Sequence, residues 1–141
     1  MTAFMRWLAV FLTLAVAAPA RAQEAIPPAD AAAIRQVIQS QLDAFQKDDW
    51  PRAFGYASPG IQTRFVNPDV FSQMVRTGYP MVYRPKTVEF RDLSATQYGP
   101  TQRVFVVGPD GRAYMAFYTM ERQADGSWRI DGCTLVEFDS V

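Results

Sequence analysis

The spacing of hydrophobic residues predicts that the folded chain begins with an amphipathic helix. From residue 31 to residue 46, apolar side chains recur at steps of three and four, and polar side chains fill most of the positions between them. This spacing places the apolar side chains on one face of a helix of about four turns. Asp30 stands just before it, where an N-cap is expected. The apolar positions are Ile34, Val37, Ile38, Leu42 and Phe45.

Two shorter helices are predicted to follow. Asp48-Asp49 ends the first helix and is expected to cap the second one while facing solvent, because aspartate is a favoured cap. The second helix starts near Pro51 and stops at Ser58-Pro59-Gly60. Asn67-Pro68-Asp69 has the cap, the proline and the acidic side chain that begin a third helix. The pattern between residues 61 and 66 does not distinguish a helix from a strand.

Beyond residue 80 the pattern becomes strand-like. Two tight turns, residues 109–112 (PDGR) and 124–127 (ADGS), contain the Asp-Gly pair that is typical of hairpins. The runs between and around them predict an antiparallel meander. The predicted strands are Met81 to Tyr83, Thr87 to Ala95, Val104 to Val107, Ala113 to Glu121 and Trp128 to Phe138.

The last predicted strand changes phase in its middle. Trp128 and Ile130 share one face, whereas Cys133 and Leu135 would fall on the opposite face of a regular strand. An extra residue at Asp131-Gly132 would bring all four side chains to the same face. We therefore predict a β-bulge there, which would also bend the strand.

The first 22 residues are expected to be a signal peptide rather than part of the fold. Arg6 precedes an apolar run that is short for a membrane span, and Ala20-Arg21-Ala22 matches the small-x-small cleavage pattern. The alternative is an uncleaved anchor helix. Cleavage after Ala22 predicts a periplasmic or secreted protein without a membrane span, a loose tether over residues 23–30 and one domain over residues 31–141.

Charge and composition exclude several classes of function. Without Arg6 and Arg21 the chain has 12 basic and 14 acidic residues, a net charge of −2, which disfavours nucleic-acid binding. It contains no histidine, so histidine-dependent metal sites and nucleophile pairs are excluded. No motif for a phosphate, a dinucleotide or a metal is present. We therefore expect neither a cofactor nor a metal.

Cys133 is the single cysteine. An internal disulfide is therefore impossible, and the simplest interpretation is a small buried residue in a strand. An intermolecular disulfide or a reactive thiol are the alternatives.

Several stretches resemble the nuclear transport factor 2-like superfamily. Leu42–Phe54 (LDAFQKDDWPRAF) resembles its first helix pair, and Gly126–Ile130 (GSWRI) resembles the opening of its last strand. Gly78–Pro85 (GYPMVYRP) and Asp131–Cys133 are similar to a small exported bacterial family within it, domain of unknown function 4864. The resemblance covers roughly Ala31 to Phe138.

This resemblance implies an α+β cone, in which about three helices close a strongly curved antiparallel sheet around a cavity. The superfamily contains isomerases, dehydratases, cyclases and binding or dimerisation modules, so the fold does not select a function. Its outer sheet face is the usual dimer surface, which implies a possible homodimer here. The histidine-dependent chemistry of some members does not carry over.

Tyr79, Tyr83 and Arg84 are the candidate ligand-binding residues at the rim of the cone. Their phenols and guanidinium could hold a carboxylate or a carbonyl oxygen. The alternative is a rim that packs its rings and leaves the polar ends in water. The Tyr79–Pro80 peptide bond could be cis, although few such bonds are.

Inside the cone, Tyr118 and Cys133 are further candidates for contact with a ligand. Asp131, beside the expected bulge, is the one candidate for a catalytic acid or base, because bulges often re-aim side chains near active sites. The alternative for Asp131 is an exposed residue that stabilises the bulge.

Three functional interpretations follow. The first is a non-catalytic module of the cell envelope that binds a small apolar or weakly acidic molecule or another protein. The second is a histidine-free lyase or isomerase that uses Asp131 with tyrosine hydrogen-bond donors. The third is a structural dimer whose cone is filled by its own side chains.

Overall fold

A computed structural model describes residues 25–138, so the predicted signal peptide lies outside the described residues. The described chain contains five helices followed by four strands. The helices are α1 (Pro28–Gln46), α2 (Trp50–Gly55), α3 (Pro59–Phe65), α4 (Pro68–Gly78) and α5 (Pro80–Tyr83). The strands are β1 (Thr87–Thr96), β2 (Gly99–Val107), β3 (Ala113–Arg122) and β4 (Trp128–Glu137).

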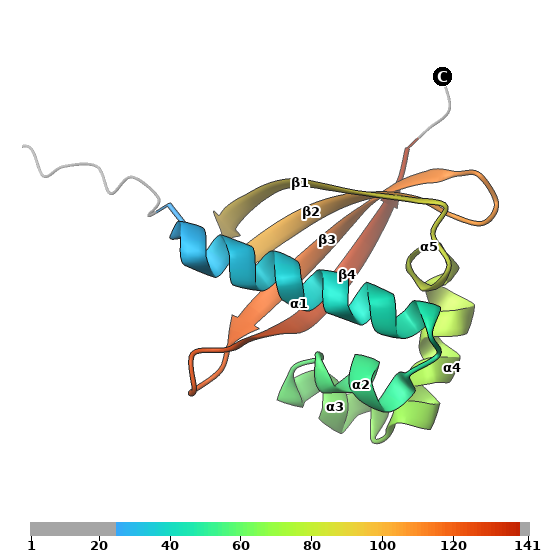
Figure 1. Ribbon diagram of the computed structural model, residues 1–141, viewed down its shortest axis with the longest axis horizontal. Helices are drawn as coiled ribbons and strands as arrows, with labels where there is room; N and C mark the ends of the chain where they lie inside the picture. The colour runs from blue at the N-terminus through green and yellow to red at the C-terminus, as the bar shows by residue number, and fades with distance from the viewer. Residues whose placement is uncertain (1–24, 139–141) are drawn as a thin grey trace, which may run out of the picture.

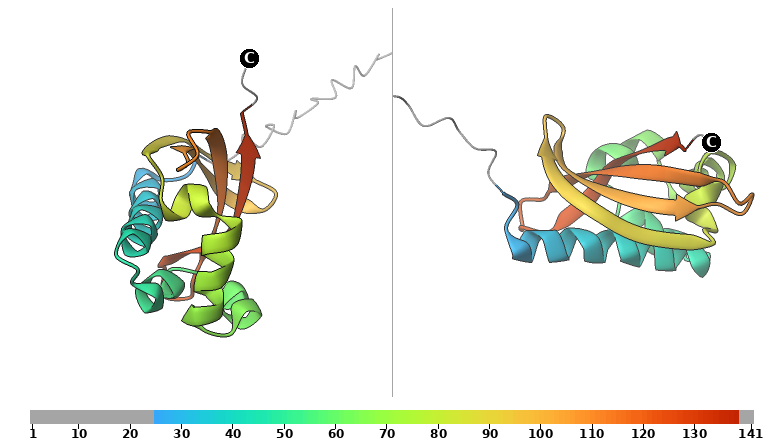
Figure 2. Two further views of the ribbon diagram at one scale, coloured as in Figure 1. Left: turned by 90° about the vertical axis from the view of Figure 1, so that its right-hand side faces the viewer. Right: turned by 90° about the horizontal axis from the view of Figure 1, so that it is seen from above.

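The strands form one antiparallel sheet in the order β1-β2-β3-β4, as a meander of hairpins. The sheet is curved, and α1 lies across its inner face while the other helices gather beside the C-terminal end of α1 (Figure 1). The right-hand view in Figure 2, from above, shows the curved strands running along α1. The predicted α+β class, with helices first and a curved antiparallel sheet after them, is confirmed.

Side-chain caps fix where three of the helices begin. Asp49, Ser58 and Asn67 accept hydrogen bonds from backbone N–H groups in the first turns of α2, α3 and α4, and each of these helices has proline in its first two positions. Because proline has no N–H to leave unsatisfied there, cap and proline together favour a helix start. The predicted start at Asn67 is confirmed.

The first helix begins earlier than predicted. α1 starts at Pro28, so Asp30 lies in its first turn rather than at its cap, and the helix takes in the end of the segment predicted as a tether. Asp30 instead accepts hydrogen bonds from Arg122 at 2.6 Å and from the Trp128 indole at 3.4 Å. These contacts join the start of α1 to the β3–β4 hairpin.

The predicted strand from Met81 to Tyr83 is wrong, because these residues form the helical turn α5. Pro80 favours a helix start, and the N–H groups of Tyr83 and Arg84 donate to the carbonyl oxygens of Tyr79 and Pro80, both at 3.0 Å. The Tyr79–Pro80 peptide bond is trans, as are all peptide bonds of the described residues. The undecided stretch between residues 61 and 66 belongs almost entirely to α3.

The predicted bulge in β4 is confirmed. Thr119 pairs with Gly132 and Met120 with Ile130, so Asp131 is the extra residue and has no partner in β3. The bulge keeps the side chains of Trp128, Ile130, Cys133 and Leu135 packed against one core. A second irregularity lies in β1 between Phe90 and Leu93. There the buried Gln102 side chain donates to the Arg91 carbonyl oxygen at 2.8 Å.

The two faces of the sheet have different surroundings. On the inner face, Val104, Ala116 and Tyr118 pack against buried side chains of α1 and α4. On the outer face, Phe105 packs on Phe138 with ring centroids 5.7 Å apart, and the Arg91 guanidinium lies over the Phe105 ring. A homodimer through this outer face stays a prediction. Within residues 25–138, no helix combines the length and apolar character needed to cross a membrane.

Candidate functional site

A cavity of about 280 Å³ lies between the helices and the inner face of the sheet. Its wall comes from α1, α3, α4, α5, β3 and β4, so segments far apart in the sequence build it together. Most of the lining is apolar, and three phenylalanine rings contribute to it. The apolar lining residues are Phe45, Ala57, Ile61, Phe65, Phe71, Met74, Val75, Val82 and Ile130.

Five uncharged polar side chains also line the cavity: Gln41, Tyr79, Tyr118, Cys133 and Thr134. The Gln41 amide donates to the Ala53 carbonyl oxygen at 3.1 Å, which ties α1 to α2. Tyr118 is only 2% exposed, and its hydroxyl has no hydrogen-bond partner of acceptable geometry among the described residues. The Cys133 thiol lies next to this hydroxyl and contributes to raising the pKa of Tyr118. A thiol is, however, only a weak hydrogen-bond partner.

Burial controls the protonation of this inner pair. Desolvation raises the pKa of the Cys133 thiol to about 12, and it raises the pKa of the Tyr118 phenol well above its ordinary value. Both groups therefore stay neutral at physiological pH. Because the thiolate is the nucleophilic form of cysteine, this environment disfavours the reactive-thiol alternative for Cys133.

Asp131 also lines the cavity, although the residue as a whole is exposed. Its carboxylate accepts a hydrogen bond of 2.7 Å from the Ser58 hydroxyl, and Ser58 is completely buried. The Ser58 backbone N–H donates to the Ile130 carbonyl oxygen at 2.8 Å. The bulge therefore directs Asp131 towards the start of α3, where Ser58 holds it.

Tyr79 lies in the cavity wall with its hydroxyl already used. The hydroxyl donates to the Cys133 carbonyl oxygen at 3.0 Å, which links the junction of α4 and α5 to β4. Desolvation is the main cause that raises the pKa of this phenol. Arg64, at the end of α3, is the cationic member of the lining, and it makes no ion pair within residues 25–138.

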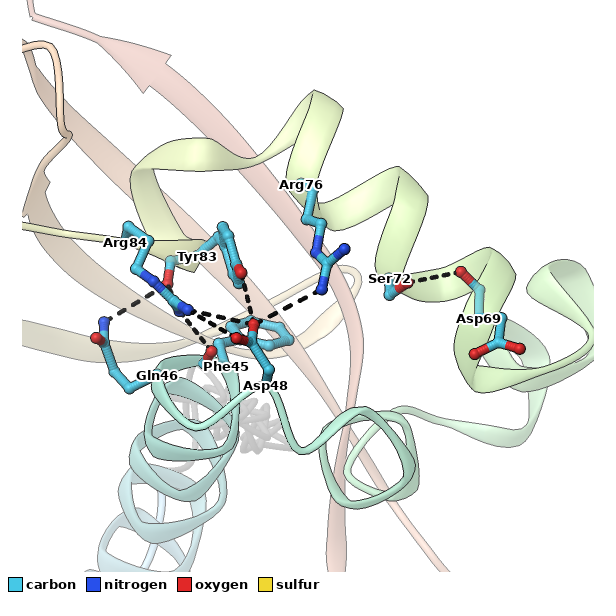
Figure 3. A network of polar contacts seen from close by, with 8 residues as sticks. All are labelled: Phe45, Gln46, Asp48, Asp69, Ser72, Arg76, Tyr83 and Arg84. Carbon is cyan, nitrogen blue, oxygen red and sulfur yellow. Dashed lines mark hydrogen bonds and ion pairs between the residues drawn. The ribbon is translucent and has the colours of Figure 1, made fainter.

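Tyr83 and Arg84, the other two residues predicted at the rim, lie outside this lining and bind Asp48 instead (Figure 3). The Tyr83 hydroxyl donates to Asp48 at 2.5 Å, and Arg84 contacts both carboxylate oxygens at 3.2 Å. Arg76 of α4 approaches the same carboxylate at 3.8 Å. We call these four residues the Asp48 clasp; it joins the end of α1 to α4 and α5.

The prediction that Asp48-Asp49 caps the second helix holds for one of the two residues. Asp49 caps α2, whereas Asp48 has a left-handed backbone (φ 53°) and accepts the hydrogen bonds of the clasp. The Tyr83 hydrogen bond is the largest cause that lowers the pKa of Asp48, and Arg84 and Arg76 add to it. Asp48 therefore has a positioning role that its place in the sequence did not indicate.

Gln41, Ser58 and Arg64 also contribute to the site, and none of them was predicted from the sequence. Ser58 carried a usable signal, because a serine directly before Pro59 is typical of a helix start. Gln41 and Arg64 carried none, since a glutamine or an arginine in a helical pattern ordinarily faces solvent. No group of three or more metal-ligating side chains occurs within the described residues.

Comparisons with known proteins place the chain in a family. A search of curated proteins found no significant match. Among solved structures, ActVI-ORFA from Streptomyces coelicolor is similar with a TM-score of 0.48 and 13% sequence identity, over 79% of this chain and 97% of that one. The profile of a family described as "Domain of unknown function (DUF4864)" matches residues 27–141. Because this match takes in most of the sequence, the chain belongs to that family.

Proposed function

We propose that this protein is an exported, non-catalytic protein of the nuclear transport factor 2-like superfamily that binds a small, largely apolar molecule in its cavity. The cavity is the observation that carries this proposal. Its volume of about 280 Å³ is close to the lower end of the range for small-molecule sites, roughly 300–1,000 Å³. Its lining is mostly apolar with a few polar groups, which is the usual composition of such sites.

The same geometry gives less support to the other two interpretations. A carboxylate-based isomerase or lyase needs a base and a tyrosine donor that both face one substrate. Here the one candidate base, Asp131, already accepts a hydrogen bond from the buried Ser58 hydroxyl, so its carboxylate is held by the fold. A structural dimer with a filled cone needs side chains that occupy the cavity, and a space of about 280 Å³ is open instead.

Export is part of the proposal and rests on the sequence of residues 1–22. A charged start, an apolar run and a small-x-small site together favour cleavage after Ala22 and a periplasmic or secreted location. The mass of the protein purified from a bacterial periplasm tests this directly. A mature chain that begins at Gln23 is expected. A full-length chain, or one retained in the cytoplasm, would contradict export.

Native mass spectrometry on the same material tests ligand binding. We expect a reproducible additional mass on the wild-type protein that disappears in Ala57→Leu, because Ala57 lines the cavity and a larger side chain there occupies its space. Ala113→Leu is the matched control, since Ala113 lies in β3 outside the cavity lining. The additional mass should persist in this control.

A bare wild-type protein, even after incubation with a lipophilic extract of the host cells, would overturn the binding proposal. An additional mass that survives Ala57→Leu would place the ligand elsewhere on the protein. The same spectra also report whether the protein is a monomer or a dimer.

A further inference from the structure

One polar group in the cavity wall has no role in the fold. The Tyr118 hydroxyl is buried without a hydrogen-bond partner of acceptable geometry among the described residues. A buried hydroxyl that lacks a partner destabilises a protein, and such groups are rare enough in folded proteins to need an explanation. A phenylalanine would fill the same place without this cost.

The Tyr118 side chain belongs to the cavity wall, while its hydroxyl is covered by neighbouring atoms. Tyr118 is in β3, in the middle of the inner face of the sheet, and it lines the cavity together with Cys133 of β4. The hydroxyl exposes almost no surface to water, so bulk solvent does not satisfy it. Side-chain rotamer changes of the kind that are common on binding would let a ligand atom reach it.

We propose that the ligand is a neutral molecule with a carbonyl oxygen, and that this oxygen accepts a hydrogen bond from the Tyr118 hydroxyl. This inference rests on the proposed binding function and narrows it to one chemical class. Burial holds the pKa of the phenol far above physiological pH, so Tyr118 keeps its proton and acts as a donor. A carbonyl oxygen has the lone pairs that such a donor needs.

The charges around the cavity explain why the ligand is neutral. The titratable side chains that act on the Tyr118 hydroxyl are those of Cys133 and Tyr79, and both are uncharged. Asp131 adds a negative charge to the wall, and the cationic Arg64 belongs to an exposed position on α3. A carboxylate placed beside Tyr118 would lose its hydration without gaining a cation, which is unfavourable for a buried charge.

The apolar wall points to a ring-shaped body for the ligand. Phe45 and Phe65 both pack against Phe71, with ring centroids 6.3 and 6.1 Å apart, and all three rings line the cavity. Aromatic rings favour offset-stacked or edge-to-face contacts with one another. A flat, apolar ring system would make such contacts while its carbonyl group reaches Tyr118.

Three matched probes test the inference on the purified mature protein: 2-acetylnaphthalene, 2-ethylnaphthalene and 2-naphthoate. They share a ring system and differ in having a neutral carbonyl, no oxygen or a charged carboxylate. Isothermal titration calorimetry is expected to show that 2-acetylnaphthalene binds about tenfold more tightly than 2-ethylnaphthalene, the worth of one hydrogen bond. The carboxylate is expected to bind most weakly.

Tyr118→Phe should remove the advantage of 2-acetylnaphthalene and leave the affinity for 2-ethylnaphthalene unchanged. Tyr114→Phe is the matched control, because it deletes a phenol hydroxyl from the same strand but outside the cavity lining. The advantage should persist in this control. The comparison of the first two probes on wild-type protein tests the inference without any variant.

The outcomes separate this inference from the binding proposal. Equal affinities for the acetyl and ethyl probes, or an advantage that survives Tyr118→Phe, would overturn the carbonyl inference and leave the binding proposal standing. Tightest binding of 2-naphthoate, abolished by Arg64→Gln, would overturn it in favour of an acid held by α3. Failure of all three probes to bind would count against both proposals.

Discussion

The cavity wall and the Asp48 clasp treat polar side chains in opposite ways. In the clasp, Asp48 receives hydrogen bonds from Tyr83 and Arg84, so the cluster is satisfied by the protein itself. In the cavity wall, Tyr118 has a buried hydroxyl without such a partner. A satisfied cluster holds elements together, whereas a buried group without a partner needs another explanation, which we propose is a ligand. This difference separates the four clasp residues from Tyr118, although the Trp50 indole N–H beneath the clasp also lacks a partner among the described residues.

Two tyrosines four positions apart show the difference within one segment. Tyr79 lines the cavity and bonds to β4, while Tyr83 joins the clasp. The helical turn α5 between them brings Tyr83 back towards the end of α1, which a strand would not do. A single error in secondary structure therefore assigned Tyr83 and Arg84 to the wrong neighbourhood.

The largest expected effect comes from the aromatic side chain beneath the clasp. Trp50 is 8% exposed, packs on Phe45 and Tyr83 with ring centroids 5.6 and 5.5 Å apart, and lies under the Arg76 guanidinium. Trp50→Ala should lower the free energy of unfolding by about 3–5 kcal/mol, the range for removing a buried aromatic side chain. Urea unfolding followed by circular dichroism measures it.

Trp50→Phe is the control for this prediction, because it keeps a ring at the same place. Its loss should be clearly smaller than that of Trp50→Ala. A loss below about 1 kcal/mol for Trp50→Ala is typical of surface positions. It would show that the packing of Trp50 under the clasp contributes little to the stability of the fold.

The second effect concerns the residue that holds Asp131. Ser58 caps α3 and donates to Asp131, and it is fully buried. Ser58→Ala should lower the free energy of unfolding by about 1–2 kcal/mol, since it removes a helix cap and a hydrogen bond to a carboxylate. Chemical unfolding curves of the two proteins measure the loss.

Ser127→Ala provides the comparison. Ser127 also donates to an aspartate, Asp125, at 2.6 Å, but it does so in an exposed turn. Because solvent replaces an exposed hydrogen bond easily, this variant should change stability much less than Ser58→Ala. Equal losses in the two variants would mean that burial and capping add nothing at Ser58.

Local rules were sufficient to predict much of the fold from the sequence. The Asn67-Pro68 helix start, the Asp-Gly turns and the bulge at Asp131 each depend on residues close together in the chain. These features succeed because caps, turns and strand alternation are set by the nearest neighbours. Short apolar runs are the exception, since Met81 to Tyr83 fits a strand or a helical turn equally well.

The candidate site was harder to predict because it depends on distant contacts. Ser58 and Asp131 are 73 positions apart, and nothing in either neighbourhood indicates the other. That Tyr118 would lack a partner also follows only from what packs around it. The sequence could place Tyr79, Tyr118, Cys133 and Asp131 near a cone, but it could not show which polar groups the protein satisfies by itself.

Deleting one tyrosine hydroxyl from the cavity wall and one from the Asp48 clasp compares the two regions directly. Tyr118→Phe should leave the free energy of unfolding within about 1 kcal/mol of the wild type or raise it, because it removes a buried group that lacks a partner. Tyr83→Phe should lower the free energy of unfolding, because it removes the hydrogen bond that the Tyr83 hydroxyl donates to Asp48. Thermal unfolding of the ligand-free proteins measures both. A larger loss for Tyr118→Phe than for Tyr83→Phe would contradict the contrast between the two regions.

The smallest effect is the dependence of the clasp on pH. The Tyr83 hydrogen bond, followed by Arg84 and Arg76, lowers the pKa of Asp48 below its ordinary 3.8. A carboxylate whose pKa is lower in the folded chain than in the unfolded one stabilises the fold while it is ionised. Its contribution is therefore complete above pH 3.8 and is lost as the pH falls through the folded value. Asp48→Asn should remove this dependence.

The melting temperatures of the wild type and Asp48→Asn, measured from neutral pH to well below 3.8, check this sign. The wild type should be the more stable protein at neutral pH, and the difference should shrink as Asp48 takes up its proton. Asp125, whose pKa Ser127 also lowers, is present in both proteins, so its contribution cancels in the difference. A difference that stays constant over this range would show that the charge of Asp48 does not stabilise the clasp, and that geometry alone joins α1 to α5.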